Sequence, residues 1–175
     1  MEHSNRGDIY HFFESDHRRL DALLEKAFTS SGLVEYETFH QFRVGLLTHI
    51  KMEERVLFPA ARQANPELMN AVIPRFRLEH GAITALLVLP PTHANLGILR
   101  HVVEQHDLAE EEIGGLYDIC EKLTKEDRSK ILETLKMTEH VPVHPPNPAV
   151  IAIESARRAL ARAGYDFDAL LQANE

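Results

Sequence analysis

The stretch HIKMEERVLFP, residues 49–59, decides the fold class of this chain. It places His49 and Glu53 four residues apart, and His106 and Glu110 repeat that spacing further along the chain. Residues four apart on a helix lie on the same face, one turn above the other. The chemistry of both pairs therefore depends on whether that face meets water or the protein interior.

Breaks in the sequence separate four segments of helical length. These breaks are TSSG at 29–32, ANP at 64–66 and LPPTHAN at 89–95. No segment alternates apolar and polar residues as a half-buried strand would. We therefore expect an all-α protein with main helices over about 8–28, 34–63, 67–88 and 95–122.

Each predicted helix has an apolar face whose residues recur at alternating steps of three and four, as in a bundle helix. A histidine interrupts that face in every helix, and two helices add a glutamate one turn later. The second helix would continue its face through Val56 and Ala60, and the fourth through Ile113 and Tyr117. The polar residues expected to face inward are His17, His49, Glu53, His80, His106 and Glu110.

The spacing of the four histidines predicts that they lie at one level. In an up-down-up-down bundle, inward residues meet when they are equally far from the intervening turn. The midpoint between each histidine and the next falls inside or beside one of the three breaks. We therefore expect an up-down-up-down four-helix bundle with one internal polar layer.

A short fifth helix is expected after the bundle. Thr124 followed by Asp127 can cap it, and it would run to about residue 137. The segment TEHVPVHPPNPAV is then too rich in proline to be helical. We expect residues 1–137 to form the bundle with its fifth helix, and residues 138–175 to form a proline-rich connection and a helical extension.

The extension has its own helix signals. Asn147 and Pro148 suit the N-cap and first turn of a helix, which Gly164 would end. Its apolar side, from Val150 to Leu160, could pack along the bundle or form a homodimer interface.

Composition limits the partners and the location. The net charge is −8 with no basic run, which argues against duplex nucleic acid. No apolar run approaches the roughly 18 residues of a membrane span, and the first residues do not resemble a secretory signal. We therefore expect no membrane partner and a cytoplasmic location. Cys120 is the only cysteine, which excludes an internal disulfide and a cysteine-rich zinc site.

Four imidazoles and two carboxylates in a dry core need a compensating partner. An isolated buried carboxylate is costly or takes up a proton. Imidazole nitrogen and carboxylate oxygen are good ligands for iron, manganese and zinc. Six side chains exceed the needs of one tetrahedral zinc, and two glutamates can bridge two ions with two histidines left for each. The residues therefore favour a pair of irons, with manganese or zinc as alternatives.

The order and spacing of these six residues resemble the hemerythrin-like family, also called HHE cation-binding domains, over roughly residues 8–122. The local sequences HIKMEERVLFPA and EHGAI are typical of that family. The resemblance implies a four-helix bundle that holds an oxo- or hydroxo-bridged, non-haem di-iron centre. By the same resemblance, Glu53 and Glu110 would bridge the irons, His17 and His49 would bind one iron, and His80 and His106 would bind the other.

One position departs from the oxygen carriers of that family, which have a further histidine where this chain has Thr84. The departure implies an additional open coordination position on the second iron. Glu79 or another residue could supply the missing ligand. Family members carry or sense oxygen, sense iron or handle nitric oxide, and Thr84 favours a role other than carriage.

Three functions are consistent with these residues. The first is a non-haem di-iron protein that binds O2, NO or iron for sensing, storage or stress handling. The second is a di-iron oxidase, peroxidase or nitric oxide reductase that uses an open site near Thr84. The third is a metal-free interaction bundle whose polar layer only fixes helix pairing.

Several polar residues near the layer have simpler interpretations. Asp21 could accept a hydrogen bond from a ligand histidine or face water. Tyr10 and Tyr117 are expected a turn or more beyond the layer, packing with a polar tip. The histidines predicted to lie outside the site are His11, His40, His93, His101, His140 and His144.

Overall fold

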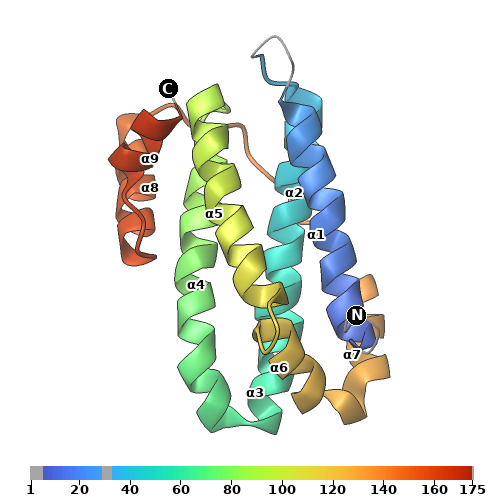
Figure 1. Cartoon of the computed structure of the whole chain (residues 1–175). Helices are drawn as coiled ribbons and strands as arrows, with labels where there is room; N and C mark the ends of the chain where they lie inside the picture. Colours follow the sequence, from blue (N-terminus) through green and yellow to red (C-terminus); the bar gives the residue numbers. More distant parts are fainter. Residues whose placement is uncertain (1–5, 29–32, 175) are drawn as a thin grey trace.

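The computed structural model describes residues 6–28 and 33–174, and over these residues the chain is helical without a β-strand, apart from one isolated bridge between Phe28 and Val34. In Figure 1 the chain runs up through the first long helix, down the second, up the third and down the fourth. The all-α prediction is confirmed, whereas the break predicted at 29–32 lies outside the described residues. The helices of the bundle are α1 (Asp8–Ala27), α2 (Tyr36–Met52) with α3 (Phe58–Ala64), α4 (Pro66–Val88) and α5 (His93–Glu111).

The core of the bundle consists of two hydrophobic clusters with a polar layer between them. On α1, Phe13 belongs to one cluster and Leu20 to the other, and His17 lies between them. The same order holds on α4, where Phe76 and Ile83 flank the histidine. Each of the six residues predicted to face inward is at most 4% exposed. The six polar residues therefore face inward at a common level in the structure, as predicted.

The second predicted helix contains a π-helical turn, η2 (Glu53–Leu57). Pro59 follows two residues after it, and its ring lacks an N–H and crowds the preceding turn, which a wider turn accommodates. The wider turn shifts the inward face by one residue, so that Leu57 is fully buried. Val56 and Ala60, predicted to continue the inward face, are only partly buried, although both pack against the core cluster.

The helix predicted over 95–122 is interrupted after α5. A bend follows, and α6 (Leu116–Leu123) runs in a new direction (Figure 1). Gly114 has a φ of 79°, and a Cβ atom on Gly115 would lie 2.7 Å from a backbone oxygen, so the bend depends on both glycines. Ile113, predicted to face inward, is therefore 81% exposed.

The predicted fifth helix corresponds to a 3-10 turn, η3 (Lys125–Asp127), followed by α7 (Arg128–Lys136). Its predicted capping is wrong, since neither Thr124 nor Asp127 caps a helix through its side chain. The Thr124 hydroxyl instead donates a hydrogen bond to the backbone carbonyl of Cys120.

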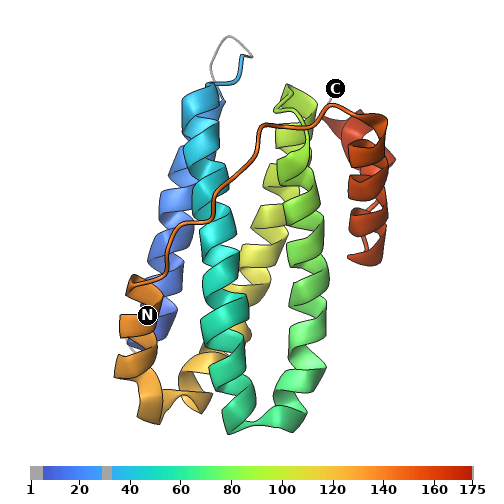
Figure 2. The same ribbon diagram turned by 180° about the vertical axis from the view of Figure 1, so that it is seen from behind.

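The proline-rich segment crosses α2 as an extended connection (Figure 2), as predicted. Three side chains of α2 hold it in place. Lys51 Nζ donates to the carbonyl of Glu139 and Arg43 Nη2 to that of His144, while Thr48 Oγ1 accepts the N–H of residue 141.

The extension then forms α8 (Val150–Arg162) and α9 (Phe167–Ala173), and α8 packs on α4. Leu160 is fully buried in that contact, but Val150, predicted on the same apolar side, is 73% exposed. Gly164 ends α8 with a φ of 90°, as predicted. Asn147 does not cap the helix, because its side chain accepts the N–H of residue 149, before α8 begins.

Candidate metal centre

The structure brings the six predicted residues together in the middle of the bundle. They come from α1, α2, η2, α4 and α5, and their potential ligand atoms form two groups in which all atoms lie within 4.8 Å of one another. Glu110 belongs to both groups, as expected for two adjacent ions. The first group is His17, His49 and Glu110, and the second is Glu53, His80, His106 and Glu110.

The second group contains unpaired polar atoms. Four buried side-chain atoms, one from each member, have no hydrogen-bond partner among the described residues: Glu53 Oε2, His80 Nε2, His106 Nε2 and Glu110 Oε1. His80 Nε2 lies 3.0 Å from Glu53 Oε2, and His106 Nε2 lies 3.1 Å from Glu110 Oε1, without hydrogen-bond geometry. Unpaired buried polar atoms are costly, so a cation among these four atoms would remove the cost.

Each histidine of the layer turns Nε2 inward because a carboxylate holds its Nδ1. We call these four carboxylates, Asp16, Glu54, Glu79 and Glu111, the outer carboxylates. A metal-binding histidine usually donates its other ring N–H in this way, which fixes its tautomer and orientation. The Nδ1 distances are 2.6 Å for His17–Glu111, 2.9 Å for His49–Asp16, 3.0 Å for His80–Glu54 and 2.8 Å for His106–Glu79.

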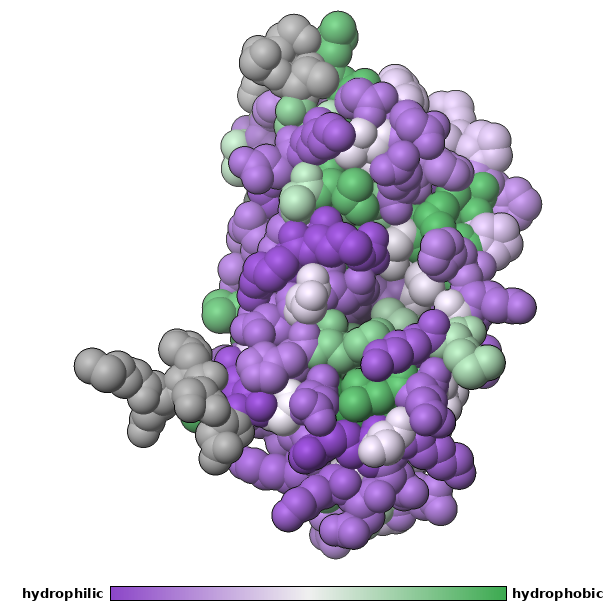
Figure 3. Space-filling view, turned by 90° about the vertical axis from the view of Figure 1, so that its right-hand side faces the viewer, coloured by the Kyte–Doolittle hydropathy of each residue, from purple (hydrophilic) through white to green (hydrophobic). Residues whose placement is uncertain are grey.

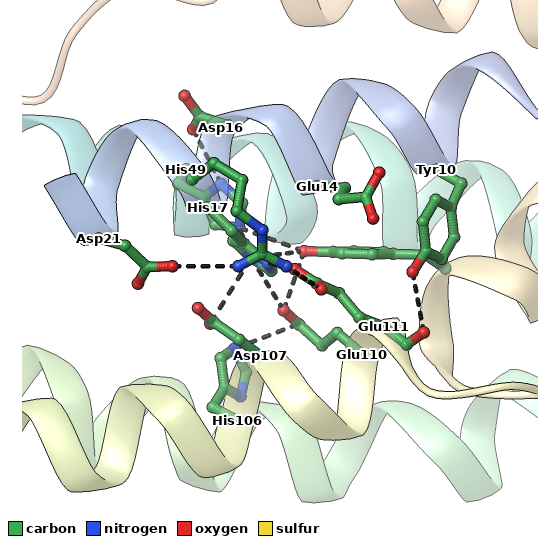
Figure 4. Close-up of polar contacts among 12 residues, drawn as sticks. Tyr10, Glu14, Asp16, His17, Asp21, His49, His106, Asp107, Glu110 and Glu111 are labelled. Atoms are coloured by element: carbon green, nitrogen blue, oxygen red, sulfur yellow. Dashed lines mark hydrogen bonds and ion pairs between the residues drawn. The ribbon is translucent and has the colours of Figure 1, made fainter. Parts of the chain in front are cut away.

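The outer carboxylates connect the helices in a closed ring. Each one is the sequence neighbour of a layer residue but binds the histidine of the next helix around the bundle. Asp16 of α1 holds the histidine of α2, and Glu54 of η2 holds that of α4. Glu79 of α4 holds the histidine of α5. Glu111 of α5 holds that of α1 (Figure 4). Of the four, only Glu79 was singled out from the sequence, and then as a candidate ligand, although each predicted helix has an acidic residue directly beside a layer residue.

An arginine at the surface contacts each outer carboxylate: Arg19 contacts Asp16, Arg77 contacts Glu54, Arg75 contacts Glu79 and Arg18 contacts Glu111. Burial raises the pKa of Glu54 and Glu79, but their histidine and arginine partners outweigh it and hold both pKa values below the ordinary range. Glu54 and Glu79 are therefore ionised acceptors, and each of the four outer carboxylates lies between a buried histidine and a solvated arginine.

Asp21 is not one of these acceptors. Its carboxylate binds Arg18 at 3.0 Å (Figure 4), and its side chain is 46% exposed. Of the two interpretations of Asp21, the structure supports the one in which it faces water.

The structure also bears on the position where the oxygen carriers have an extra histidine. Thr84 is exposed, and Ile83 takes the inward position on that turn of α4. Glu79 does not replace a ligand, because one of its oxygens binds His106 Nδ1 and the other binds Arg75. Neither residue reaches the space between the ligand atoms.

In the metal-free layer, protons on the imidazole rings compensate the charges of the carboxylates. Burial lowers the pKa of His17, but Glu110 and Glu111 outweigh it and raise the pKa to about 11. Burial also lowers the pKa of His49, but Glu53 and Asp16 raise it to about 9. Conversely, burial raises the pKa of Glu53, and the neighbouring histidines hold it well below the ordinary value. The metal-free layer is thus a network of imidazolium and carboxylate groups whose protons a metal would displace.

Tyr117 lies in the layer, so the prediction that it packs beyond the layer is wrong. Its hydroxyl donates toward Glu53 Oε1 at 2.7 Å and lies 2.9 Å from Glu110 Oε2. It also lies 3.1 Å from His17 Nε2 and 3.2 Å from His49 Nε2. Burial and these two carboxylates raise the tyrosine pKa well above its ordinary value. The pair of glycines before α6 was the signal that this helix changes direction.

A groove of about 1010 Å³ opens on the face formed by α1, α2 and α7, where hydrophobic side chains lie in a hollow between hydrophilic ones (Figure 3). Its wall includes Asp16, the carboxylate that holds His49, but none of the six layer residues. The groove therefore reaches the polar layer only through an outer carboxylate. The six histidines predicted to lie outside the site are all exposed.

The family model described as "Hemerythrin HHE cation binding domain" matches residues 8–88, which confirms the predicted resemblance. The match covers α1 to α4, and α5 with its two layer residues lies beyond it. Neither a curated protein nor a solved structure matches the chain. Among the residues that the structure describes, no helix combines the length and hydrophobicity that a membrane crossing requires.

Proposed function

Since the chain carries a hemerythrin HHE cation binding domain over residues 8–88, we propose that it is a non-haem di-iron protein. It would bind O2, NO or iron itself, in sensing, storage or stress handling. The observation that carries this proposal is the ring of four imidazoles around two buried glutamates, with every Nδ1 held by a carboxylate. That arrangement prepares four Nε2 atoms for metal binding in one layer.

The two glutamates would each help to hold both ions. Glu110 offers Oε2 at 3.3 Å from His17 Nε2 and Oε1 at 3.1 Å from His106 Nε2. Glu53 offers Oε1 at 3.6 Å from His49 Nε2 and Oε2 at 3.0 Å from His80 Nε2. Each carboxylate thus turns one oxygen to each side. This supports one ion held by His17 and His49 and a second held by the other two histidines.

Imidazole and carboxylate donors suit iron, and they also bind manganese and zinc. A pair of Fe(II) ions would supply electrons and coordination positions for a diatomic ligand. The protein supplies a dry, rigid setting, because hydrophobic clusters close the layer on both sides.

An anaerobic titration of the metal-free protein with Fe(II) tests the proposal, with bound iron measured per chain. We expect a break at two irons. His49→Ala and His106→Ala should each lose iron, whereas His40→Ala, which changes an exposed histidine of the same α2, should keep two. A break at one iron would contradict the dinuclear site, and a break at two only with manganese or zinc would contradict iron. If none of these ions binds, the metal-free interaction bundle remains as the hypothesis.

A di-iron redox enzyme is the alternative function. The sequence suggested it through an open position near Thr84, but that side chain is exposed and faces away from the layer. Only a measurement of catalytic turnover can therefore support the enzyme alternative. Consumption of O2, H2O2 or NO by the iron-loaded protein with a reductant, at many cycles per site, would establish it.

A further inference from the structure

We propose that Tyr117 is a further protein ligand of the metal centre and binds through its phenol oxygen the ion held by His17 and His49. This inference rests on the proposed function, because it requires a metal among these atoms. It adds an oxygen donor that neither the spacing of the histidines nor the matched residues 8–88 contain.

The first argument is the arrangement of donor atoms. With metal–ligand bonds of about 2.1 Å, donors at right angles around an ion lie about 3 Å apart. The Tyr117 oxygen has four such neighbours, at 2.7, 2.9, 3.1 and 3.2 Å. The spacing around this oxygen is therefore that of a donor sharing an ion with its neighbours.

Three of these neighbours belong to one group of potential ligand atoms, that of His17, His49 and Glu110, which lie within 4.8 Å of one another. His17 Nε2 lies 3.0 Å from His49 Nε2 and 3.3 Å from Glu110 Oε2. His49 Nε2 lies 3.6 Å from Glu53 Oε1. The tyrosine oxygen lies within 3.2 Å of the ligand atoms of His17, His49 and Glu110, so it would join them in holding one ion.

The second argument is the hydrogen-bonding capacity of the phenol. A neutral tyrosine has one proton to donate and two lone pairs. Two of its four neighbours are oxygens of Glu53 and Glu110, which only accept when ionised, and one proton cannot serve both. One of these oxygens therefore pairs with a histidine, as Glu110 Oε2 does with His17 Nε2 at 3.3 Å, and the lone pairs of the phenol remain near the two Nε2 atoms, where an ion would bind.

The third argument is the rigidity of the tyrosine. Its side chain is fully buried, and its ring stacks on Phe13 with centroids 5.0 Å apart and meets Tyr10 edge-on. In an unbroken α5, residue 117 would lie about 10 Å along the axis from Glu110. The bend at the two glycines instead places its hydroxyl 2.9 Å from that carboxylate. A donor held this firmly needs no rearrangement to bind a metal.

The test is the spectrum of the ferric protein. Two equivalents of Fe(II) are added under nitrogen and oxidised with ferricyanide, and absorption and resonance Raman spectra are recorded. A phenolate bound to Fe(III) gives a visible charge-transfer band, and excitation in that band enhances the tyrosine ring vibrations. We expect these vibrations in the natural protein and their loss in Tyr117→Phe, with iron affinity at one site lowered about tenfold or more.

Tyr10→Phe is the matched control, because Tyr10 is equally buried but its hydroxyl donates to the backbone carbonyl of Glu111. It should keep the tyrosine vibrations. If the natural protein holds two irons and shows no such vibrations, or if Tyr117→Phe keeps them, the inference is wrong while the di-iron proposal stands. Failure to bind iron at all would overturn the di-iron proposal and this inference with it.

Discussion

Replacing Glu79 by glutamine should weaken the binding of one of the two proposed metal ions and leave the affinity for the other unchanged. The substitution keeps the size of the side chain and an oxygen that can accept from His106 Nδ1, but it removes the charge that holds this imidazole. Changes of such partners typically cost 10–100-fold in metal affinity, which is about 1.4–2.7 kcal/mol. The Glu79 side chain is only 8% exposed, so solvent screens its charge little and we expect a value near the upper end.

For the other outer carboxylates, the structure predicts how much metal affinity each substitution should cost and which of the two ions it should affect. Glu54 is 22% exposed, so Glu54→Gln should weaken binding less than Glu79→Gln does, near tenfold. Both variants act on the ion held by His80 and His106. Asp16→Asn acts through His49 and should weaken the other ion.

Competition titrations against a chelator of known affinity measure the two binding steps separately. Glu104→Gln is the control, because this glutamate is exposed on the same helix as His106. The reasoning is refuted if Glu79→Gln binds both ions as tightly as the control. It is also refuted if Glu79→Gln and Asp16→Asn weaken the same binding step.

Three further results are expected. With free iron at 100 times its dissociation constant, each bound ion should add about 2.7 kcal/mol to the free energy of unfolding and raise Tm by about 5–11 °C. Calorimetry with and without a chelator measures this shift, and no shift would favour the metal-free bundle. In the metal-free protein, protonated His17 (pKa about 11) and His49 (pKa about 9) stabilise the fold fully below about pH 6.5, and this stabilisation is lost as pH rises through those pKa values. Tm should therefore fall between about pH 7 and 11, and a constant Tm over that range would contradict the proton network. Leu160→Ala should destabilise the packing of α8 on α4 by about 2–5 kcal/mol, as measured by denaturant unfolding, and leave iron binding intact; loss of iron would show that the extension supports the site.

The sequence by itself determined the helical class, the inward faces and the common level of the four histidines. These features depend on spacing along a helix and on distance from a turn, and both can be counted along the chain. His17, His49, Glu53, His80, His106 and Glu110 are buried together in the structure for this reason. Their role as ligands remains a proposal that the iron titration tests.

Only the tertiary structure decided what surrounds these six residues. The π turn before Pro59 moved the inward position from Val56 to Leu57, and the bend at two glycines turned Tyr117 into the layer. Asp16 is the sequence neighbour of His17 but holds His49, because its side chain points to the adjacent helix. Periodicity describes one helix at a time, whereas contacts between helices depend on their relative rotation and on local breaks, which change the direction of every later residue.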